Sequence, residues 1–506
     1  MFLGNEEKVY ILDKVENNPT KINGHPAWAV SWDIATNTAT PMEMSTNTFC
    51  AAGMHAPNGS FYTFGGNGAI GPGGNIGSVK NPDLVSGMFD GTYQDWDGAK
   101  AIRVIDPCVD NSCGWFDNSS TLAMAKKRWY PGAEALSDGT VVLVGGFVNG
   151  GYVNRNFPNT DPTNQGGAAE PTYEFYPSRG APQQMAFMTS TSGLNAYTHL
   201  YLMPSGNMFA QANLSTSESF YVFFVCRKLM CVVLWNYTAN VEIPLPSMPN
   251  GVVRVYPASG GVAMLPLTPA NNYTPTILFC GGSNMSADDY GDYSNPRADT
   301  FYIPASNDCQ RITPEPSDGS VAGYTQDDDM PEGRTMGQFI ILPDQTLLMI
   351  NGGANGTAGY ATNTGNTPAG SMPYTMSLAA APVLQPAIYD PSKPQGQRWS
   401  NNGLMQSTIP RLYHSSALLL PDASVLVAGS NPNVDYNATA FFPTEYRAER
   451  FYPPYLNGTV RPQPSGMPQN LSYGGDPFDI VVPSTSYSGS ANEAAGNTTV
   501  VIIRPG

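Results

Sequence analysis

The stretch that decides the fold is Leu136-Ser137-Asp138-Gly139-Thr140-Val141-Val142-Leu143-Val144-Gly145-Gly146. An apolar residue leads into a polar turn, the turn leads into a short apolar run, and the run ends in two glycines. The Asp-Gly pair predicts a tight hairpin, because both residues tolerate the backbone angles of a chain reversal. The apolar run predicts a strand that is buried on both faces. The glycine pair predicts that another backbone passes close by.

The same pattern recurs through most of the chain. Three further clear copies cover residues 57–66, 342–353 and 420–429, and two weaker copies cover residues 203–210 and 277–282. A recurring unit that cannot bury its apolar face alone is typical of a β-propeller, in which each blade covers its neighbour. The pattern is similar to the kelch repeat, with blades longer than the usual period of about 50 residues. An array of β-sandwiches would also give many strands and turns, but the Gly-Gly endings favour the propeller.

The composition agrees with an all-β chain and argues against one class of partner. The 52 glycines and 45 prolines make about a fifth of the 506 residues, and only 13% of the residues are charged. The formal net charge of -16 would repel a phosphate backbone, so we expect no nucleic-acid partner. The acidic run Asp327-Asp328-Asp329 is interpreted as a solvated loop rather than a cation site.

The seven cysteines divide into two candidate disulfides, a local pair and one residue left over. The two candidate bridges close one small loop and one longer turn-rich stretch, and they are Cys108 with Cys113 and Cys280 with Cys309. Cys226 and Cys231 share one segment, where they either pair or stay free. Cys50 is then unpaired, and it is either a functional thiol or a buried inert cysteine.

The sequence contains conflicting signals for the localisation of the protein. Glu6 and Glu7 stand where the basic part of a secretory leader should be, so no leader is visible. Several Asn-x-Ser/Thr sequons, including those at Asn118, Asn355 and Asn437, suit a glycosylated surface. Together with the candidate disulfides, they predict a secreted glycoprotein whose signal peptide is absent from this chain.

Residues 217–233 interrupt the repeat with a run of apolar side chains. The run is too short, and too broken by Arg227-Lys228, to span a bilayer, so we expect no membrane span. It is interpreted either as a retained intron or as a genuine apolar insertion. A genuine insertion would create an exposed strand that is prone to aggregation.

Three separated segments carry the candidate site: Asn47-Thr48-Phe49-Cys50-Ala51-Ala52-Gly53, Arg128-Trp129-Tyr130-Pro131 and Arg411-Leu412-Tyr413-His414-Ser415. Together they resemble the radical-copper site of the glyoxal oxidase and galactose oxidase family, and the similarity runs through essentially the whole chain. The resemblance implies a seven-bladed kelch-type propeller over residues 1–445. It also implies the start of an immunoglobulin-like domain over residues 446–506, which are too few to close a sandwich of about 100 residues.

The resemblance assigns a role to each residue of the site. Tyr130 would be an equatorial copper ligand and the radical carrier, joined through a thioether bond to the sulfur of Cys50. Tyr413 would be the axial ligand and the general base, because a metal can stabilise a phenolate whose ordinary pKa is near 10. His414 would be an equatorial imidazole ligand, which suits copper.

The implied reaction is the oxidation of small aldehydes of the glyoxal or methylglyoxal type to carboxylic acids, with reduction of O2 to H2O2. The Tyr130 radical would abstract a hydrogen atom after Tyr413 has accepted the substrate proton. Trp129 or Phe147 could flank the radical, although core packing is the simpler interpretation for both. An oxidase of galactose or primary alcohols with the same mechanism is the alternative within the family. We expect a monomer.

One ligand of the family pattern is absent, because the chain reaches Gly506 before a second C-terminal histidine. With three of four ligands, the chain as given is expected to bind copper weakly and to have little oxidase activity. A kelch binding module without chemistry is the other alternative, and it would need neither Cys50 nor the Tyr413-His414 pair. The remaining histidines are interpreted as structural: His25, His55 and His199.

Overall fold

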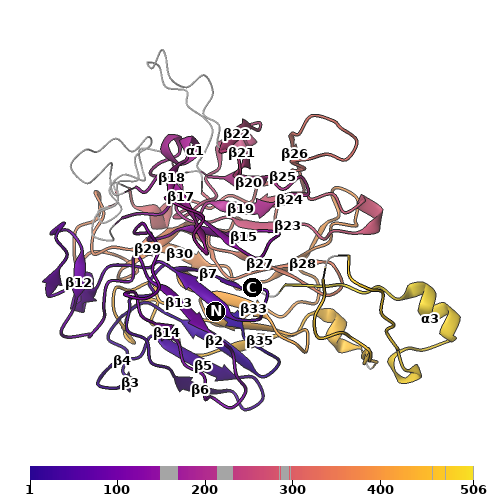
Figure 1. The fold of residues 1–506 in the computed structure, drawn as a ribbon, viewed down its shortest axis with the longest axis horizontal. Coiled ribbons are helices and arrows are strands. Elements are labelled where there is room, and N and C mark those ends of the chain that lie inside the picture. The colour runs from indigo at the N-terminus through magenta and orange to yellow at the C-terminus, as the bar shows by residue number, and fades with distance from the viewer. Residues whose placement is uncertain are drawn as a thin grey trace.

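The computed structural model describes residues 1–148, 169–212, 232–283, 285, 296, 298–458, 460–472 and 474–504. In these residues, seven antiparallel sheets form the blades of a β-propeller (Figure 1). The innermost strands of blades 2 and 3, 3 and 4, 5 and 6, and 6 and 7 contact one another, and the first strand of the chain contacts the innermost strand of the last blade. The predicted seven-bladed, all-β fold is therefore confirmed.

The strands of each blade follow the chain from the centre outward. Blades 1 to 3 are β1 (Phe2–Leu3), β2 (Lys8–Leu12), β5 (Ala29–Asp33), β6 (Thr38–Pro41); β7 (Ala52–His55), β8 (Phe61–Phe64), β13 (Ile102–Ile105), β14 (Phe116–Asp117); and β15 (Gly132–Ala135), β16 (Val141–Val144), β17 (Thr172–Tyr176), β18 (Gln183–Gln184). Blades 4 and 5 are β19 (His199–Leu202), β20 (Met208–Gln211), β21 (Val232–Asn236), β22 (Val241–Pro244); and β23 (Gly261–Met264), β24 (Ile277–Cys280), β25 (Cys309–Ile312), β26 (Tyr324–Gln326). Blades 6 and 7 are β27 (Gln338–Ile341), β28 (Leu347–Ile350), β31 (Ala387–Tyr389), β32 (Trp399–Ser400); and β33 (Ser416–Leu419), β34 (Val425–Ala428), β35 (Glu449–Phe451).

Smaller elements decorate the loops between these strands. Four two-stranded ribbons pair β3 (Lys21–Ile22) with β4 (His25–Pro26), β9 (Ile70–Gly71) with β10 (Asn75–Ile76), β11 (Val79–Lys80) with β12 (Gly87–Phe89), and β29 (Gly353–Tyr360) with β30 (Ser377–Pro382). The described α-helices are α1 (Ala186–Ser190) and α3 (Ala491–Asn497). None of the described helices is long and apolar enough to cross a bilayer.

The apolar run of each copy of the sequence repeat is the second strand of a blade. In every copy except residues 277–282, the polar turn forms the hairpin between the first and second strands. In blade 3 the amide N–H of Leu136 donates to the carbonyl oxygen of Thr140 at 2.8 Å. The Asp138 carboxylate accepts from the Thr140 amide at 3.1 Å and from its hydroxyl at 2.7 Å. Gly139 supplies the positive φ of 81° that closes the turn.

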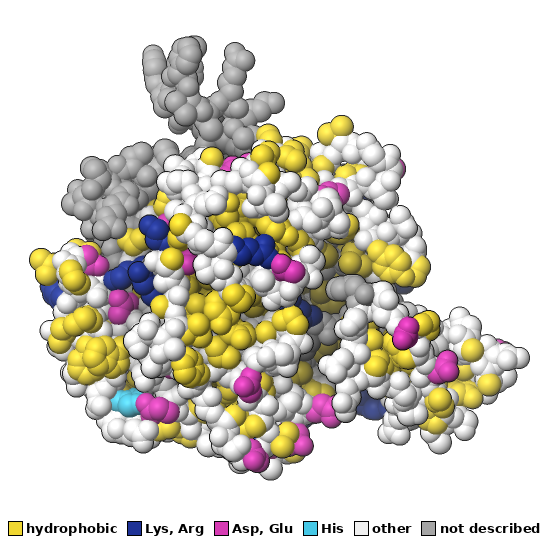
Figure 2. Space-filling view, viewed as in Figure 1, with side chains coloured by type: hydrophobic (Ala, Val, Ile, Leu, Met, Phe, Trp, Pro, Cys, Tyr) yellow, Lys and Arg dark blue, Asp and Glu magenta, His cyan; other side chains and the backbone are white. Residues whose placement is uncertain are grey.

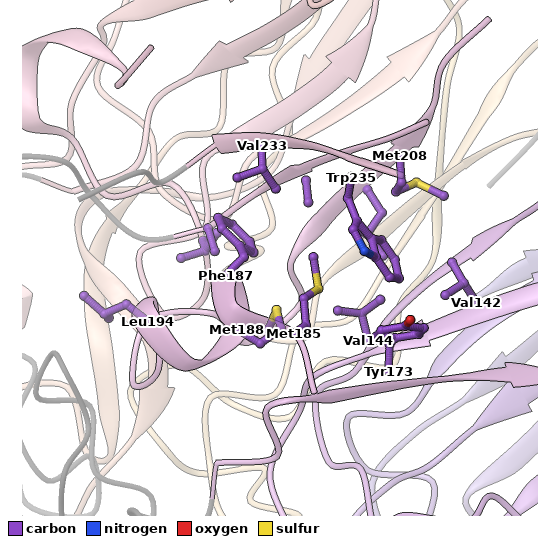
Figure 3. Packing of buried hydrophobic residues seen from close by; sticks show 14 of the residues in the cluster. Val142, Val144, Tyr173, Met185, Phe187, Met188, Leu194, Met208, Val233 and Trp235 are labelled. Carbon is purple, nitrogen blue, oxygen red and sulfur yellow. The ribbon is translucent and has the colours of Figure 1, made fainter. Parts of the chain in front are cut away.

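Buried apolar side chains form one cluster between each pair of neighbouring blades. Figure 3 shows the cluster between blades 3 and 4, where Val142 and Val144 of β16 lie across from Met208 and Trp235. Burial of one such side chain contributes about 1.5–3 kcal/mol, so these clusters supply the main driving force for closing the ring. Charged side chains are sparse on the surface in Figure 2, in line with the composition.

The second glycine of each pair lets the end of the second strand approach the segment that leads into the first strand of the same blade. A Cβ atom added at Gly66 would lie 2.2 Å from the carbonyl oxygen of Asn47. A Cβ atom added at Gly146 would lie 2.8 Å from the carbonyl oxygen of Trp129. Since Asn47 and Trp129 flank Cys50 and Tyr130 in the sequence, the glycines allow the close packing of backbone around the candidate site.

The cysteine predictions hold where the structure describes them. Cys108 is bonded to Cys113 and Cys280 to Cys309, while Cys50 is a free thiol. Cys226 and Cys231 lie outside the described residues. The same is true of the suspected insertion except for Val232 and Val233, which belong to β21.

The acidic run at 327–329 is not the solvated loop that the sequence predicted. Asp327 is only 2% exposed and accepts hydrogen bonds from the Tyr389 hydroxyl at 2.8 Å and the Arg398 guanidinium at 2.5 Å. Asp328 accepts from the amide of Arg398 at 2.9 Å. The prediction failed because the charge run faces arginine and backbone donors of blade 6, so its first two carboxylates tie blade 5 to blade 6.

The residues after the propeller form few regular elements. Since β35 pairs with β34 in blade 7, we propose that the boundary of the propeller lies after Phe451. Beyond it, the described chain contains α3, two 3-10 helices (Pro454–Asn457 and Ser484–Ser486) and one bridge between Ser465 and Val481. The immunoglobulin-like domain stays a prediction.

Candidate metal and radical site

The candidate site is built from the lead segments, by which we mean the stretch immediately before the innermost strand of a blade. In blades 2 to 7, the residue two positions before that strand has a positive φ, and these residues are Cys50 (59°), Tyr130 (60°), Tyr197 (51°), Ser259 (34°), Met336 (58°) and His414 (68°). A left-handed conformation costs a non-glycine residue roughly 1–2 kcal/mol, so the surrounding structure must hold it in place. In blades 2 to 7, the side chain two residues before the innermost strand therefore leaves the backbone from the same left-handed conformation.

Buried arginines anchor these lead segments. Arg128 donates to the carbonyl oxygens of Gly145 and Thr172, both at 2.8 Å, and pairs with the Glu174 carboxylate at 2.9 Å. Three other arginines likewise donate to the carbonyl oxygen of the first residue after a second strand. These bonds join Arg254 to Gly281, Arg334 to Asn351 and Arg411 to Gly429. The planar guanidinium satisfies several carbonyl groups at once and so fixes the adjacent tyrosines.

The structure brings the predicted residues Cys50, Tyr130 and Tyr413 into one buried cluster. The Tyr130 amide donates to the Cys50 carbonyl oxygen at 3.0 Å, and the hydroxyl oxygens of Tyr130 and Tyr413 are 3.3 Å apart. Burial raises the pKa of the Cys50 thiol, and hydrogen bonding with the hydroxyls of Tyr130, Tyr197 and Tyr413 opposes this shift. The sulfur and the phenol that the sequence paired therefore lie side by side.

A third phenol, which the sequence prediction missed, completes this arrangement. The Tyr130 hydroxyl donates to the Tyr256 hydroxyl at 3.1 Å, and the oxygens of Tyr256 and Tyr413 are 3.2 Å apart. A signal for Tyr256 exists in the sequence, because Arg254-Val255-Tyr256-Pro257 repeats the pattern Arg128-Trp129-Tyr130-Pro131. Both segments carry a buried arginine two residues before the tyrosine.

His414 has a free ring nitrogen, and its ring stacks on that of Tyr413 with the ring centres 3.7 Å apart. Its Nδ1 bonds to the carbonyl oxygen of Asn431 at 2.9 Å, and its buried Nε2 has no hydrogen-bond partner. Burial lowers the pKa of His414 to about 3, with a smaller contribution from the Lys14 charge, so the ring is neutral. A bond at Nδ1 that leaves the Nε2 lone pair free is the usual arrangement of a metal-binding imidazole.

A buried polar network supports Asn431 from the other side. The Asn431 side-chain amide donates to Glu16, and the Glu16 carboxylate lies 3.6 Å from the Lys14 ammonium group. Lys14 donates to the carbonyl oxygen of Val434 at 2.8 Å, and its ammonium group lies 4.6 Å from the centre of the Tyr360 ring. No sequence motif indicates this network, because its members are isolated residues.

The titratable groups of the site are uncharged in this environment. Burial raises the pKa of the Cys50 thiol to about 12 and raises the pKa of Tyr413 well above its ordinary value. Both groups could become anions only if a bound cation compensated the charge. In the part of the chain that is described, no three or more His, Cys, Asp and Glu residues form a metal-binding group.

Two phenols and an imidazole with an orphaned nitrogen fit a copper ion, which accepts both nitrogen and oxygen donors. Trp129 and Phe147 both contact Tyr130, with ring centres 4.4 Å and 6.3 Å from its ring. A cavity of about 580 Å³ between blades 1 and 7 has His414 and Asn431 in its lining.

The other histidines have structural partners. His25 bonds to the Glu43 carboxylate at 2.9 Å, His55 to the carbonyl oxygen of Leu3 at 2.8 Å, and His199 to the Gln211 side chain at 2.6 Å. Each ring is thereby tied to its own or the preceding blade, which agrees with the structural role that the sequence predicted.

The fold and the site define a class: a seven-bladed β-propeller with a buried cluster of phenols, a thiol and an imidazole at the start of its innermost strands. A family model described as "Glyoxal oxidase N-terminus" matches residues 152–455. The aldehyde oxidase GLOX of Vitis pseudoreticulata is 30% identical over 469 residues, which cover 90% of this chain and 70% of that protein. The aldehyde oxidase GLOX1 of Arabidopsis thaliana is 29% identical over 499 residues, covering 96% of this chain and 65% of that protein. The chain belongs to the glyoxal oxidase family.

A solved structure shares the fold. It is described as a novel fungal alcohol oxidase of the AA5 family in complex with copper, and its TM-score to this chain is 0.53. The match covers 94% of this chain and 79% of that chain at 16% sequence identity. At this level of identity the match establishes the architecture of the propeller.

Proposed function

We propose that this chain is a copper radical oxidase that oxidises small aldehydes, of the glyoxal or methylglyoxal type, to carboxylic acids and reduces O2 to H2O2. The observation that carries the proposal is the meeting of the Cys50 thiol, the Tyr130 phenol and the Tyr413 phenol in one cluster, with the His414 ring stacked on Tyr413 and its Nε2 without a hydrogen-bond partner. The two relatives named as aldehyde oxidases support the substrate class.

Three side chains are the proposed metal ligands: Tyr130 and Tyr413 through their oxygens, and His414 through Nε2. A bound copper ion would supply a one-electron redox centre and would stabilise the two phenolates. The surrounding cluster is apolar, so it would keep water away from the reacting groups.

We further propose that Cys50 and Tyr130 form a covalent cofactor. The Cys50 sulfur would bond to the ring carbon beside the Tyr130 oxygen, with loss of one hydrogen from each residue. O2 would accept these two electrons and two protons and become H2O2. The cross-linked phenol could then store one electron hole, which a two-electron oxidation needs in addition to a one-electron metal.

In turnover, Tyr413 would accept the hydroxyl proton of an aldehyde hydrate, and the Tyr130 radical would take a hydrogen atom from its carbon. The hydrate would become the carboxylic acid, and O2 would accept the two electrons and two protons to form H2O2. Tyr130 and Tyr413 can divide this work because their oxygens are only 3.3 Å apart.

One experiment tests the cofactor and the substrate class together. The protein is loaded with copper in air and digested, and the peptides that contain Cys50 and Tyr130 are analysed by mass spectrometry. We expect one linked species, lighter than the two peptides together by two hydrogen atoms, and peroxide formation with methylglyoxal faster than with galactose. Two separate peptides and no peroxide with any substrate would instead support a kelch binding module.

The described residues offer one imidazole to this site, so we propose that a nitrogen donor limits the activity of this chain. Added imidazole should then raise peroxide formation severalfold and should leave a Tyr130→Phe variant inactive.

We also propose that the protein is secreted and monomeric, and the two disulfides support secretion.

A further inference from the structure

The three phenols of the site form a closed triangle, although the proposed function uses only two of them. The oxygens of Tyr130, Tyr256 and Tyr413 are separated by 3.1, 3.2 and 3.3 Å. Tyr256 comes from the lead segment of blade 5, whereas Tyr130 and Tyr413 come from blades 3 and 7. A cluster of three hydroxyls from three different blades requires each lead segment to be held accurately.

Tyr256 is fixed by its own surroundings. Its side chain is 7% exposed, and its ring centre lies 4.5 Å from that of Tyr130. Two residues earlier, Arg254 anchors the segment through the carbonyl oxygens of Gly281 and Asp308, the latter at 2.9 Å. The Tyr256 hydroxyl therefore lies at a defined position relative to both partner oxygens.

The direction of the hydrogen bonds is informative. Tyr130 is the donor in its bond to Tyr256, whereas either oxygen can be the donor between Tyr256 and Tyr413. A tyrosinate has no proton to donate and can only accept. Once Tyr130 and Tyr413 act as anionic ligands, Tyr256 holds the single remaining hydroxyl proton of the triangle, and the geometry directs that proton to Tyr413.

We propose that Tyr256 is a positioning residue of the oxidase, whose hydroxyl donates a hydrogen bond to the Tyr413 oxygen. This inference rests on the proposed function. The bond would fix the direction of the Tyr413 oxygen, because a hydrogen bond to a charged oxygen is short and strong. Tyr256 would thereby hold Tyr413 in place for the substrate proton without contacting the substrate.

The test compares four copper-loaded proteins: the wild type, Tyr256→Phe, Tyr256→Gln and Tyr360→Phe. Tyr256→Phe keeps the ring and removes the donor, while Tyr256→Gln keeps a donor and removes the ring. Tyr360→Phe is the matched control, because Tyr360 packs against the same cluster but lies outside the triangle. The readouts are the Cys50–Tyr130 cross-link by peptide mass, the phenolate-to-copper absorption band, and kcat and KM from peroxide formation.

We expect all four proteins to form the cross-link. Tyr256→Phe should shift the absorption band and lower kcat about tenfold, with KM changed by less than about twofold. Tyr256→Gln should keep the band near its wild-type position, and Tyr360→Phe should match the wild type in every readout. If Tyr256→Phe fails to fold, a wild-type band in Tyr256→Gln supports the inference and a shifted band overturns it.

Two other results separate the possible failures. If Tyr256→Phe retains both the band and kcat of the wild type, Tyr256 has only a packing role and the inference is wrong. If the wild type itself forms neither the cross-link nor the band, the proposed function fails, and the role of Tyr256 fails with it.

Discussion

The lead segments of blades 3 and 6 are built alike and carry different chemistry. Tyr130 and Met336 adopt nearly the same φ, 60° and 58°, and both side chains are buried in the same cluster. Arg128 and Arg334 donate in the same way, at 2.8 Å to Gly145 and at 2.7 Å to Asn351. The repeat therefore supplies a common backbone conformation at this position, which carries a phenol in blade 3 and a thioether in blade 6.

Removing the phenol of blade 3 should have the largest effect. Tyr130→Phe keeps the ring in the cluster but removes the group that would carry the radical and bind the metal. We expect peroxide formation to fall by at least roughly 1,000-fold and the cross-link to Cys50 to disappear, because these functions depend on the same oxygen. Intact mass and a peroxide-coupled assay measure both. Normal turnover by this variant would show that blade 3 is no more specialised than blade 6.

The sequence predicted the backbone of the blades better than it predicted the candidate site. The hairpin turns, the second strands and the glycine pairs follow from local backbone chemistry, so the blades could be placed from residues 136–146 and their copies. Cys50, Tyr130, Tyr413 and His414 were found by resemblance to a known pattern. Tyr256 lies in a segment that repeats the pattern around Tyr130, but the pattern does not show which phenols meet. The Lys14–Glu16 pair acts through contacts between distant parts of the chain, and nothing local to it in the sequence indicates such contacts.

The partly buried thiol of Cys50, in blade 2, should give the next largest effect. Because burial raises the pKa of Cys50 to about 12, the thiol stays protonated near pH 8, and only the thiolate is a nucleophile. We expect iodoacetamide to alkylate Cys50 in the native, metal-free protein roughly 1,000-fold more slowly than in urea, where the pKa returns to about 8.5. Peptide mass spectrometry over time separates Cys50 from the other cysteines. Equal rates in both states would mean that the thiol is open to solvent.

Arg128 in blade 3 and Arg334 in blade 6 should differ in how much each stabilises the fold. Arg128→Met should lower the free energy of unfolding by about 3–5 kcal/mol, because it leaves the Glu174 carboxylate buried without its cation. Arg334→Met should cost less, about 1–3 kcal/mol, since Arg334 mainly satisfies the carbonyl oxygens of Asn351 and Gln385. Urea unfolding followed by tryptophan fluorescence compares the two. A larger loss for Arg334→Met would contradict the role given to the ion pair.

The smallest effect should come from the side chain of blade 6. Met336 is 8% exposed and lies in the same cluster as Tyr130, but it has neither an oxidisable phenol nor a strong metal-binding atom. Met336→Leu nearly conserves volume, so we expect the free energy of unfolding to change by less than about 1.5 kcal/mol and kcat by less than about twofold. The same urea and peroxide measurements apply. A loss of activity that approaches the loss in Tyr130→Phe would show that blade 6 shapes the substrate pocket. Both lead segments would then take part in the reaction, each in a different role.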